Sequence, residues 1–215
     1  MKGKLLFILG GIWHDFEGFR GVFQPFFEKE GWQVEATYDL NRLLRLKEDG
    51  ITTVVSYTCL GPHREGYDDT GPERMEDEQV KALSSWVKDG GGLLAVHAAT
   101  VLADSSPELG QLMGGVFVSH PPAFHFTVYP LAKPHPMIQD VGAFSVLDEF
   151  YIQELVSPVE LHMVAIDRGV AHPMVWSKTE GKGRVAHIAM GHSAEVWLTP
   201  AYQRLMLQAV SWLEM

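Results

Sequence analysis

The first half of the chain alternates short apolar runs with segments in which apolar residues recur at helical spacing. Residues 5–9 form a continuous apolar run that ends at Gly10, a pattern typical of a strand covered on both faces in a parallel sheet. Helical spacing follows over residues 19–30 and again over 80–87. Further strands are predicted at 33–37, 51–57 and 93–96. This alternation predicts right-handed crossovers and a mostly parallel sheet.

Short strands replace the alternation after residue 115. They are predicted at 123–129, 144–152, 161–166, 174–177 and 184–189. The last two flank residues 179–183, whose glycines suit a hairpin turn. Thr199 and Pro200 begin a final helix with a broad apolar face. We therefore expect one α/β domain over residues 1–215, with added antiparallel strands in its second half.

Composition and charge exclude several classes of partner. A chain of 215 residues with 46% hydrophobic content can bury a substantial core. Its net charge of -10, with scattered Lys and Arg residues, leaves no basic surface for nucleic acid. No apolar run approaches the roughly 20 residues of a membrane helix, and the N-terminal run is too short for a signal peptide. A single cysteine, Cys59, fits a reducing compartment, so we expect a cytoplasmic protein without membrane contact.

Histidines recur where the predicted strands end. His14 follows the first strand, His97 follows the strand at 93–96, and His192 follows the last strand. In open α/β sheets, ligands bind outside the carboxyl ends of the strands. Imidazole titrates near neutrality and is the commonest metal ligand. The repetition predicts a site that either binds a divalent metal such as zinc or performs acid–base catalysis, although any one histidine alone is more often structural.

Other polar residues are candidates for the same site. Asp148 and Glu149 interrupt the apolar run at 146–151, and buried carboxylates are costly unless they are paired or bind a metal; a cap or turn role is equally compatible. His120 and His125 flank a diproline turn, and one of the two is expected to face the pocket. Asp15 either orients His14 or caps the helix that follows.

The sequence lacks the motifs of several familiar chemistries. It contains no nucleophile elbow, no phosphate-binding glycine loop with a lysine, no zinc-protease helix motif and no Cys-x-x-Cys. The glycines at 90–92 precede a strand and not a helix, so we expect no nucleotide cofactor. Residues 61–71 form a long, charged surface loop, and loops of about this length are often functional.

Motifs spread over nearly the whole chain resemble the trehalose-utilisation (ThuA-like) family. They lie at 90–100, 113–117, 120–122, 148–151, 173–176, 181–185 and 191–192. The resemblance implies a flavodoxin-like three-layer α/β sandwich related to class I glutamine amidotransferases. In those enzymes the turn that corresponds to His97 holds a catalytic cysteine, so thiol-based glutamine hydrolysis should be absent here. The family is associated with sugar catabolism, which implies a small-molecule sugar as partner.

Two functions remain open from the sequence. One is an enzyme for a sugar or keto-sugar derivative, of isomerase, lyase or hydrolase type. The other is a noncatalytic carbohydrate-binding or interaction domain that kept the scaffold without its nucleophile. In the first, the candidates are catalytic His97, Glu149, Asp148 and His192, metal-binding His14, His97 and His192, and substrate-binding Trp13, His120, His125 and Tyr151. The site requires the three metal-binding histidines and the carboxylates to converge within about 4–6 Å. If the final helix exposes apolar surface, a homo-oligomer is expected.

Overall fold

The computed structural model describes residues 2–215, except for the side chains of residues 102–105. The strands are β1 (Lys4–Gly11), β2 (Gln33–Thr37), β3 (Thr53–Cys59), β4 (Gly92–Val96), β5 (Gly115–Ser119), β6 (Phe124–Pro130), β7 (Phe144–Asp148), β8 (Ile152–Leu155), β9 (Glu160–Asp167), β10 (Val170–Glu180) and β11 (Gly183–Ile188). The α-helices are α1 (Phe16–Lys29), α2 (Asp77–Lys88), α3 (Pro107–Met113), α4 (Ala194–Trp197) and α5 (Pro200–Leu213). Shorter 3-10 helices lie at Leu40–Arg45, His97–Ser105 and Pro136–Ile138.

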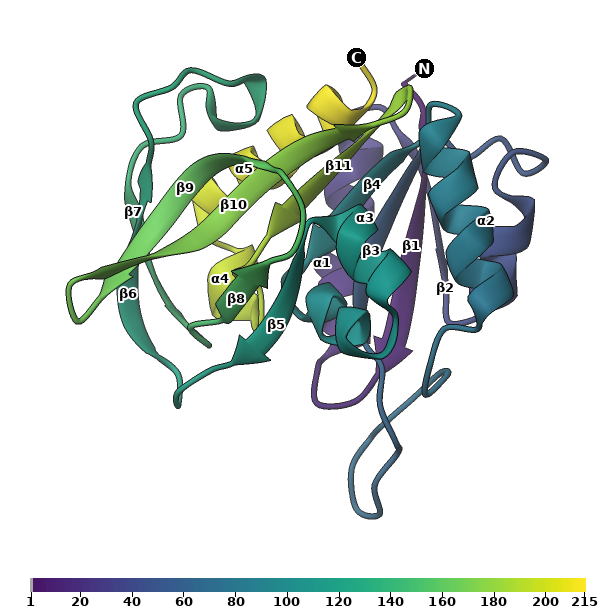
Figure 1. Cartoon of the computed structure of the whole chain (residues 1–215), viewed down its shortest axis with the longest axis horizontal. Coiled ribbons are helices and arrows are strands. Elements are labelled where there is room, and N and C mark those ends of the chain that lie inside the picture. Colours follow the sequence, from purple (N-terminus) through teal and green to yellow (C-terminus); the bar gives the residue numbers. More distant parts are fainter. Residues whose placement is uncertain (1) are drawn as a thin grey trace.

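One nine-stranded sheet runs through the molecule (Figure 1), in the order β2-β1-β3-β4-β11-β10-β9-β6-β7. The strands from β2 to β11 pair in parallel, and those from β11 to β7 pair antiparallel. A separate pair, β5 and β8, is antiparallel. The prediction of a mostly parallel core with added antiparallel strands in the second half is therefore confirmed.

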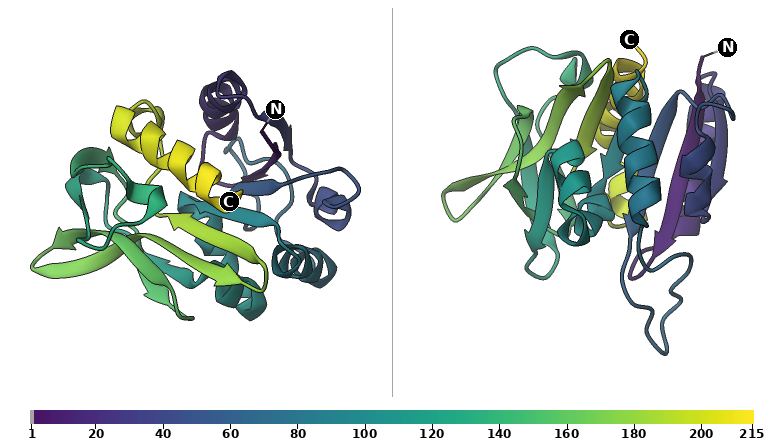
Figure 2. Two further views of the ribbon diagram at one scale, coloured as in Figure 1. Left: turned by 90° about the horizontal axis from the view of Figure 1, so that it is seen from above. Right: turned by 45° about the vertical axis from the view of Figure 1, so that its right-hand side comes forward.

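Helices cover both faces of the parallel part of the sheet. Figure 2 shows α1 and α5 on one side and α2 and α3 on the other. The residues of β1 alternate between the two resulting cores: Leu5 and Phe7 face the first, and Leu6 and Ile8 face the second. This two-sided burial explains why β1 reads as an unbroken apolar run. No helix in the described residues is both long and apolar enough to cross a bilayer.

The structure corrects two expectations in the second half. The strand predicted at 144–152 is two strands, because the chain leaves the ladder after Asp148 and resumes as β8 beside β5. The sequence analysis did not predict β5, since the glycines before it read as a helix end and its last two residues are exposed. The break matters for the site because Glu149 and Tyr151 lie in it.

Candidate functional site

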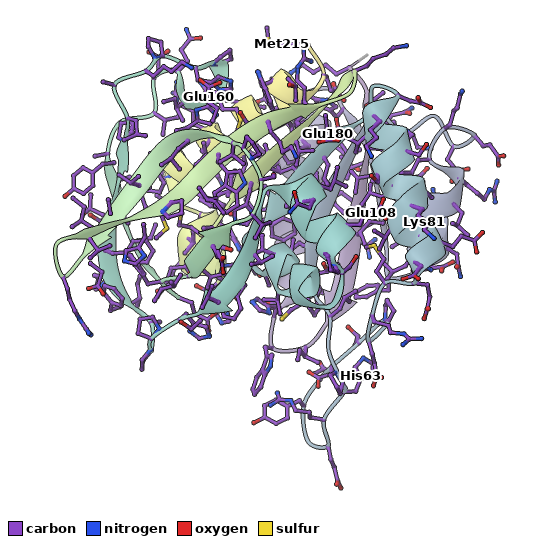
Figure 3. The ribbon with its side chains drawn as sticks, viewed as in Figure 1. His63, Lys81, Glu108, Glu160, Glu180 and Met215 are labelled. Carbon is purple, nitrogen blue, oxygen red and sulfur yellow. The ribbon has the colours of Figure 1, made fainter. Side chains whose placement is uncertain are left out.

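The candidate residues come from the turns that follow four strands. His14 follows β1, His97 follows β4 directly, His192 follows β11, and Glu149 follows β7. Parallel strands β1, β4 and β11 present their carboxyl ends at one edge of the sheet. Figure 3 shows His63 on the loop after β3, which projects from this edge, and Met215 at the opposite end of the molecule. The sheet topology thus brings together residues distant in sequence.

Three imidazoles and one carboxylate converge at this edge. One nitrogen from each of His14, His97 and His192 and one carboxylate oxygen of Glu149 all lie within 4.8 Å of one another. The ring centroids of His14 lie 5.1 Å from His97 and 4.8 Å from His192. The Oε2 atom of Glu149 is 3.4 Å from His97 Nε2 and 3.2 Å from His192 Nδ1. Ligands about 2.0–2.2 Å from one zinc ion lie roughly 3–4 Å apart, so small side-chain adjustments suffice for a shared ion.

Backbone carbonyls fix two of these rings and their proton positions. His14 Nδ1 donates to the carbonyl oxygen of Ile12 at 3.0 Å, and His97 Nδ1 donates to that of Ala189 at 2.8 Å. A carbonyl oxygen only accepts, so Nδ1 carries the proton in both rings. The lone pair is then on Nε2, which is the arrangement required of a metal-binding imidazole.

The remaining ring nitrogens that face the cluster are buried and poorly supplied with hydrogen-bond partners. Within the described residues, His14 Nε2 has no hydrogen-bond partner, and His97 Nε2 and His192 Nδ1 have only the Glu149 carboxylate, at 3.4 and 3.2 Å. An unsatisfied buried polar atom costs about 1–3 kcal/mol, and a folded protein contains few of them. Three buried nitrogens around one point, one without a partner and two sharing a single carboxylate, form an arrangement that a ligand accepting electron pairs would complete.

Charge in the cluster favours a cation. Burial opposes ionisation of Glu149, but hydrogen bonds and charge from His192 and His97 outweigh it and lower the pKa of Glu149 well below its ordinary value. Burial, followed by the charge of His97, lowers the pKa of His14 to about 3, so this ring is neutral near pH 7. The hydrogen bond to Glu149 raises the pKa of His192 despite burial. The cluster therefore combines an ionised carboxylate with at least one neutral imidazole.

The backbone at two positions is restricted by the site. His97 has φ +48, in the left-handed region that non-glycine residues enter at a cost of order 1–3 kcal/mol. Gly191, beside His192, has φ +135, and a Cβ there would lie 2.6 Å from the Tyr202 hydroxyl. Both residues lie where the chain leaves a central strand, His97 after β4 and Gly191 after β11. Strain of this kind persists where the surrounding structure holds it, most often at functional sites.

Asp148 is hydrogen-bonded to the turn that carries His192. Its carboxylate accepts hydrogen bonds from the backbone N–H groups of Gly191, at 2.7 Å, and His192, at 3.1 Å. Tyr57 and Trp197 donate to the carbonyl of Gly191. Burial raises the pKa of Asp148, although His97 and the backbone N–H groups favour its charged form. Its contacts give Asp148 a positioning role for the turn that carries His192.

Asp148→Asn is expected to lower the free energy of unfolding by about 1–3 kcal/mol, because one buried N–H group then faces an amide donor instead of an acceptor. Urea unfolding followed by circular dichroism measures this. Asp140→Asn is the matched control: Asp140 is exposed, and asparagine tolerates its φ of +57, so a change within about 0.5 kcal/mol is expected. Equal stability of the two variants would contradict the positioning role.

Aromatic residues border the cluster on one side. Tyr151 stacks on His97 at 4.0 Å and on His120 at 5.5 Å between ring centroids. His120 Nε2 is 3.8 Å from Glu149 Oε1, so its ring reaches the carboxylate. The structure thus places Tyr151 and His120 beside the four converging residues.

Other candidates lie farther out or have structural roles. Trp13 is 52% exposed and adjoins His14 in the chain. His125 is exposed on β6, and its side chain makes no hydrogen bond, ion pair or ring contact within the described residues. Asp15 caps α1 by accepting from the N–H of Gly18 at 2.8 Å, so it does not orient His14. Burial raises the pKa of the Cys59 thiol to about 12, which leaves it unreactive.

Sequence reasoning missed two residues near Trp13. The guanidinium of Arg64 lies 3.0 Å from the centroid of the Trp13 ring, and the ring of Tyr67 lies 5.0 Å from it. Both belong to the loop that was expected to be functional because of its length. No periodic pattern marks individual residues in a loop, so only the long charged insertion itself was a signal.

Comparisons with known proteins agree with this fold. A family model described as ThuA, trehalose utilisation, matches residues 9–213. A structure described as a putative ThuA-like protein from Parabacteroides merdae superposes with a TM-score of 0.80 at 18% identity, covering 100% of this chain and 91% of that one. A second, from Bacteroides uniformis, gives 0.73 at 19% identity, covering 98% and 91%.

A third structure, described as a cytoplasmic protein from Salmonella typhimurium LT2, gives a TM-score of 0.66 at 16% identity, covering 98% of this chain and 97% of that one. At such low identities these similarities establish the fold alone. No curated protein gives a significant match.

Proposed function

The chain belongs to the trehalose-utilisation (ThuA) family, and on that premise we propose that it is an enzyme that acts on a sugar or keto-sugar derivative at a divalent metal such as zinc. The family indicates a role in trehalose or sugar utilisation. The proposed metal ligands are His14, His97 and His192, and the proposed base is Glu149. Tyr151, His120 and Trp13 are the proposed contacts to the sugar.

The observation that supports this proposal most strongly is the convergence of three buried imidazole nitrogens and one carboxylate oxygen within 4.8 Å of one another. A metal ion there would give His14 Nε2 a partner and would take the place of the contacts of 3.4 and 3.2 Å that Glu149 makes with His97 Nε2 and His192 Nδ1. Zinc prefers imidazole nitrogen, and catalytic zinc sites use three protein ligands with one position open. The ionised carboxylate of Glu149 balances the charge of the ion.

The proposed chemistry divides between the ion and the protein. A bound zinc ion would polarise a carbonyl or hydroxyl oxygen of the sugar. Glu149 takes a proton from the substrate or from water, because its carboxylate is ionised and faces the cluster. His120, 3.8 Å from the other oxygen of Glu149, is placed to pass that proton on. Asp148 acts indirectly by holding the turn that carries His192.

Metal analysis tests the proposal directly. We expect about one zinc ion per chain in protein purified at neutral pH, and removal by a chelator should lower the melting temperature. Zinc at 1,000 times its dissociation constant contributes about 4 kcal/mol of stability. The metal-loaded protein is then assayed against glucosides, disaccharides and their keto derivatives, with the chelated protein as control.

A protein that takes up no divalent metal and leaves every sugar unchanged would overturn this function. Such a protein that still bound sugars would instead be the noncatalytic carbohydrate-binding domain. Turnover that is unaffected by complete chelation would mean that the protein is an enzyme that needs no metal. The histidines and Glu149 would then act as acids and bases.

A further inference from the structure

The segment of residues 149–153 carries Glu149 and Tyr151 past the histidine cluster. It leaves β7, which belongs to the nine-stranded sheet, and enters β8, which pairs with β5 in a separate two-stranded sheet (Figure 1). The ring of Tyr151 and the carboxylate of Glu149 both contact His97. Asp148 fixes the first end of the segment through its hydrogen bonds to the turn after β11. The position of Glu149 therefore also depends on what holds the other end.

Gln153 holds that other end. It is the buried residue of β8, with 8% of its surface exposed. Its side-chain nitrogen donates to the hydroxyl of Thr100 at 3.1 Å and lies 3.3 Å from Nε2 of His187. An amide nitrogen carries two hydrogens and only donates, so the imidazole accepts the second of them. Burial lowers the pKa of His187 to about 3, which leaves its ring neutral and able to accept.

The hydroxyl of Thr100 extends this connection to the cluster. It accepts from Gln153 and donates to the backbone carbonyl of His97 at 3.3 Å. His97 needs such support because its φ of +48 lies in the left-handed region, which residues other than glycine seldom adopt. A chain of two hydrogen bonds thus joins β8 to the turn that presents His97.

The spacing of contacts along the segment defines its register. Glu149, Tyr151 and Gln153 occupy alternate positions, as residues on one side of an extended segment do. The first two contact His97, and the third bonds to Thr100, three residues further along the chain. A slip of one residue would break the bond from Gln153 and turn Glu149 away from the cluster.

A contribution to stability does not by itself account for a glutamine at this place. Within the described residues, the side-chain oxygen of Gln153 is buried without a hydrogen-bond partner. A buried polar atom without a partner loses its hydration without return, so an apolar side chain of similar size would stabilise the fold at least as well. What the amide adds is direction, because a hydrogen bond specifies one arrangement of its two partners.

We propose that Gln153 is a positioning residue for the proposed base Glu149, acting through Thr100. It fixes the register of its segment against the turn after β4, and so keeps the Glu149 carboxylate in contact with both His97 and His192. This inference rests on the proposed function, because Glu149 is a base only if the protein is an enzyme.

Two substitutions of Thr100 separate positioning from packing. Thr100→Val keeps the volume and removes the hydroxyl, whereas Thr100→Ser keeps the hydroxyl and removes a methyl group. A packing role predicts that valine is tolerated better, and the positioning role predicts that serine is. The readout is the contact between the rings of His97 and Tyr151, whose centroids lie 4.0 Å apart. Nuclear Overhauser effects between the two rings measure it in the zinc-free full chain, labelled on histidine and tyrosine.

We expect Thr100→Ser to keep this ring contact, and Thr100→Val and Gln153→Met to weaken it several-fold. In the zinc-loaded protein, Gln153→Met should lower kcat by about tenfold or more, because a misplacement of about 1 Å at a reacting group costs up to about 10²-fold. Its zinc content should stay unchanged, since Glu149 is not among the proposed ligands. Gln33→Met, at an exposed position of β2, is the matched control and should behave like the wild type.

An undisturbed ring contact in both Thr100→Val and Gln153→Met would overturn the positioning role, whatever the activity. A contact that survives in Thr100→Val but not in Thr100→Ser would overturn it as well, and so would a lost contact with unchanged kcat. If the wild type takes up no zinc and converts no sugar, the proposed function fails. The ring contact in the same variants then still decides whether Gln153 places the segment that carries Glu149.

Discussion

His97→Ala should bind zinc more than about 100-fold more weakly than the wild type. Loss of an outer partner of a metal ligand already costs about 10–100-fold in affinity, and this change removes a proposed ligand itself. His97 is fully buried and contacts His14, Glu149 and Tyr151, so its loss leaves a gap in the middle of the cluster. Competition with a chromogenic chelator at fixed pH measures the dissociation constant.

Two further variants separate ligand loss from misfolding. His97→Asn suits the left-handed backbone, which asparagine adopts more readily than alanine, so it should fold well and still lose zinc. His125→Ala removes an exposed histidine of β6 and should bind zinc like the wild type. Wild-type affinity in a folded His97→Asn protein would rule out His97 as a ligand.

Glu149→Gln should keep its zinc and lose turnover by about 10²–10⁴-fold, the usual contribution of a general base. Glutamine has nearly the same shape, so the histidines keep their positions, but its amide cannot accept a proton at neutral pH. The measurement is kcat on whichever sugar the wild type converts, together with zinc content. Glu154→Gln, an exposed position on β8, is the control with the same chemical change.

Glu149→Gln can also be tested in the zinc-free protein, by a measurement that does not depend on activity. The raised pKa of His192 comes first from its hydrogen bond to Glu149, which favours the protonated ring. Removing the negative charge therefore lowers the pKa of His192, which proton NMR of its ring measures. An unchanged His192 pKa would show that the two side chains do not interact in solution, and full turnover would remove Glu149 as the base.

The central strands could be predicted because hydrophobic patterning marks both the strands themselves and the helices that flank them. The strands from β1 to β4 are buried on both faces or bounded by helices with clear spacing, so hydrophobic patterning alone locates them. The tendency of ligands to bind outside the carboxyl ends of parallel strands then pointed to His14, His97 and His192, although the distances between them were unknown. The structure brings these three together because their strands are neighbours or near neighbours in the parallel part of the sheet.

The remaining details depend on contacts that no local pattern encodes. Adjacent residues of a strand face opposite ways, so either Asp148 or Glu149 was able to face the site. Which one does so follows from where the chain leaves β7 to form β8 beside β5, a pairing between segments far apart in sequence. The stacking of Arg64 on Trp13 likewise depends on how a long loop returns to β1.

The three histidines at residues 14, 97 and 192 lie at the ends of separate strands, and this separation links the site to the folding of the entire sheet. No short segment of the chain contains all three, so the unfolded polypeptide would have little affinity for the proposed ion. Binding of the proposed ion would therefore stabilise the folded sheet, and unfolding of the sheet would release it. Substitutions in the core beneath β1, β4 or β11 should therefore reduce ion occupancy in cells even where they never touch a histidine.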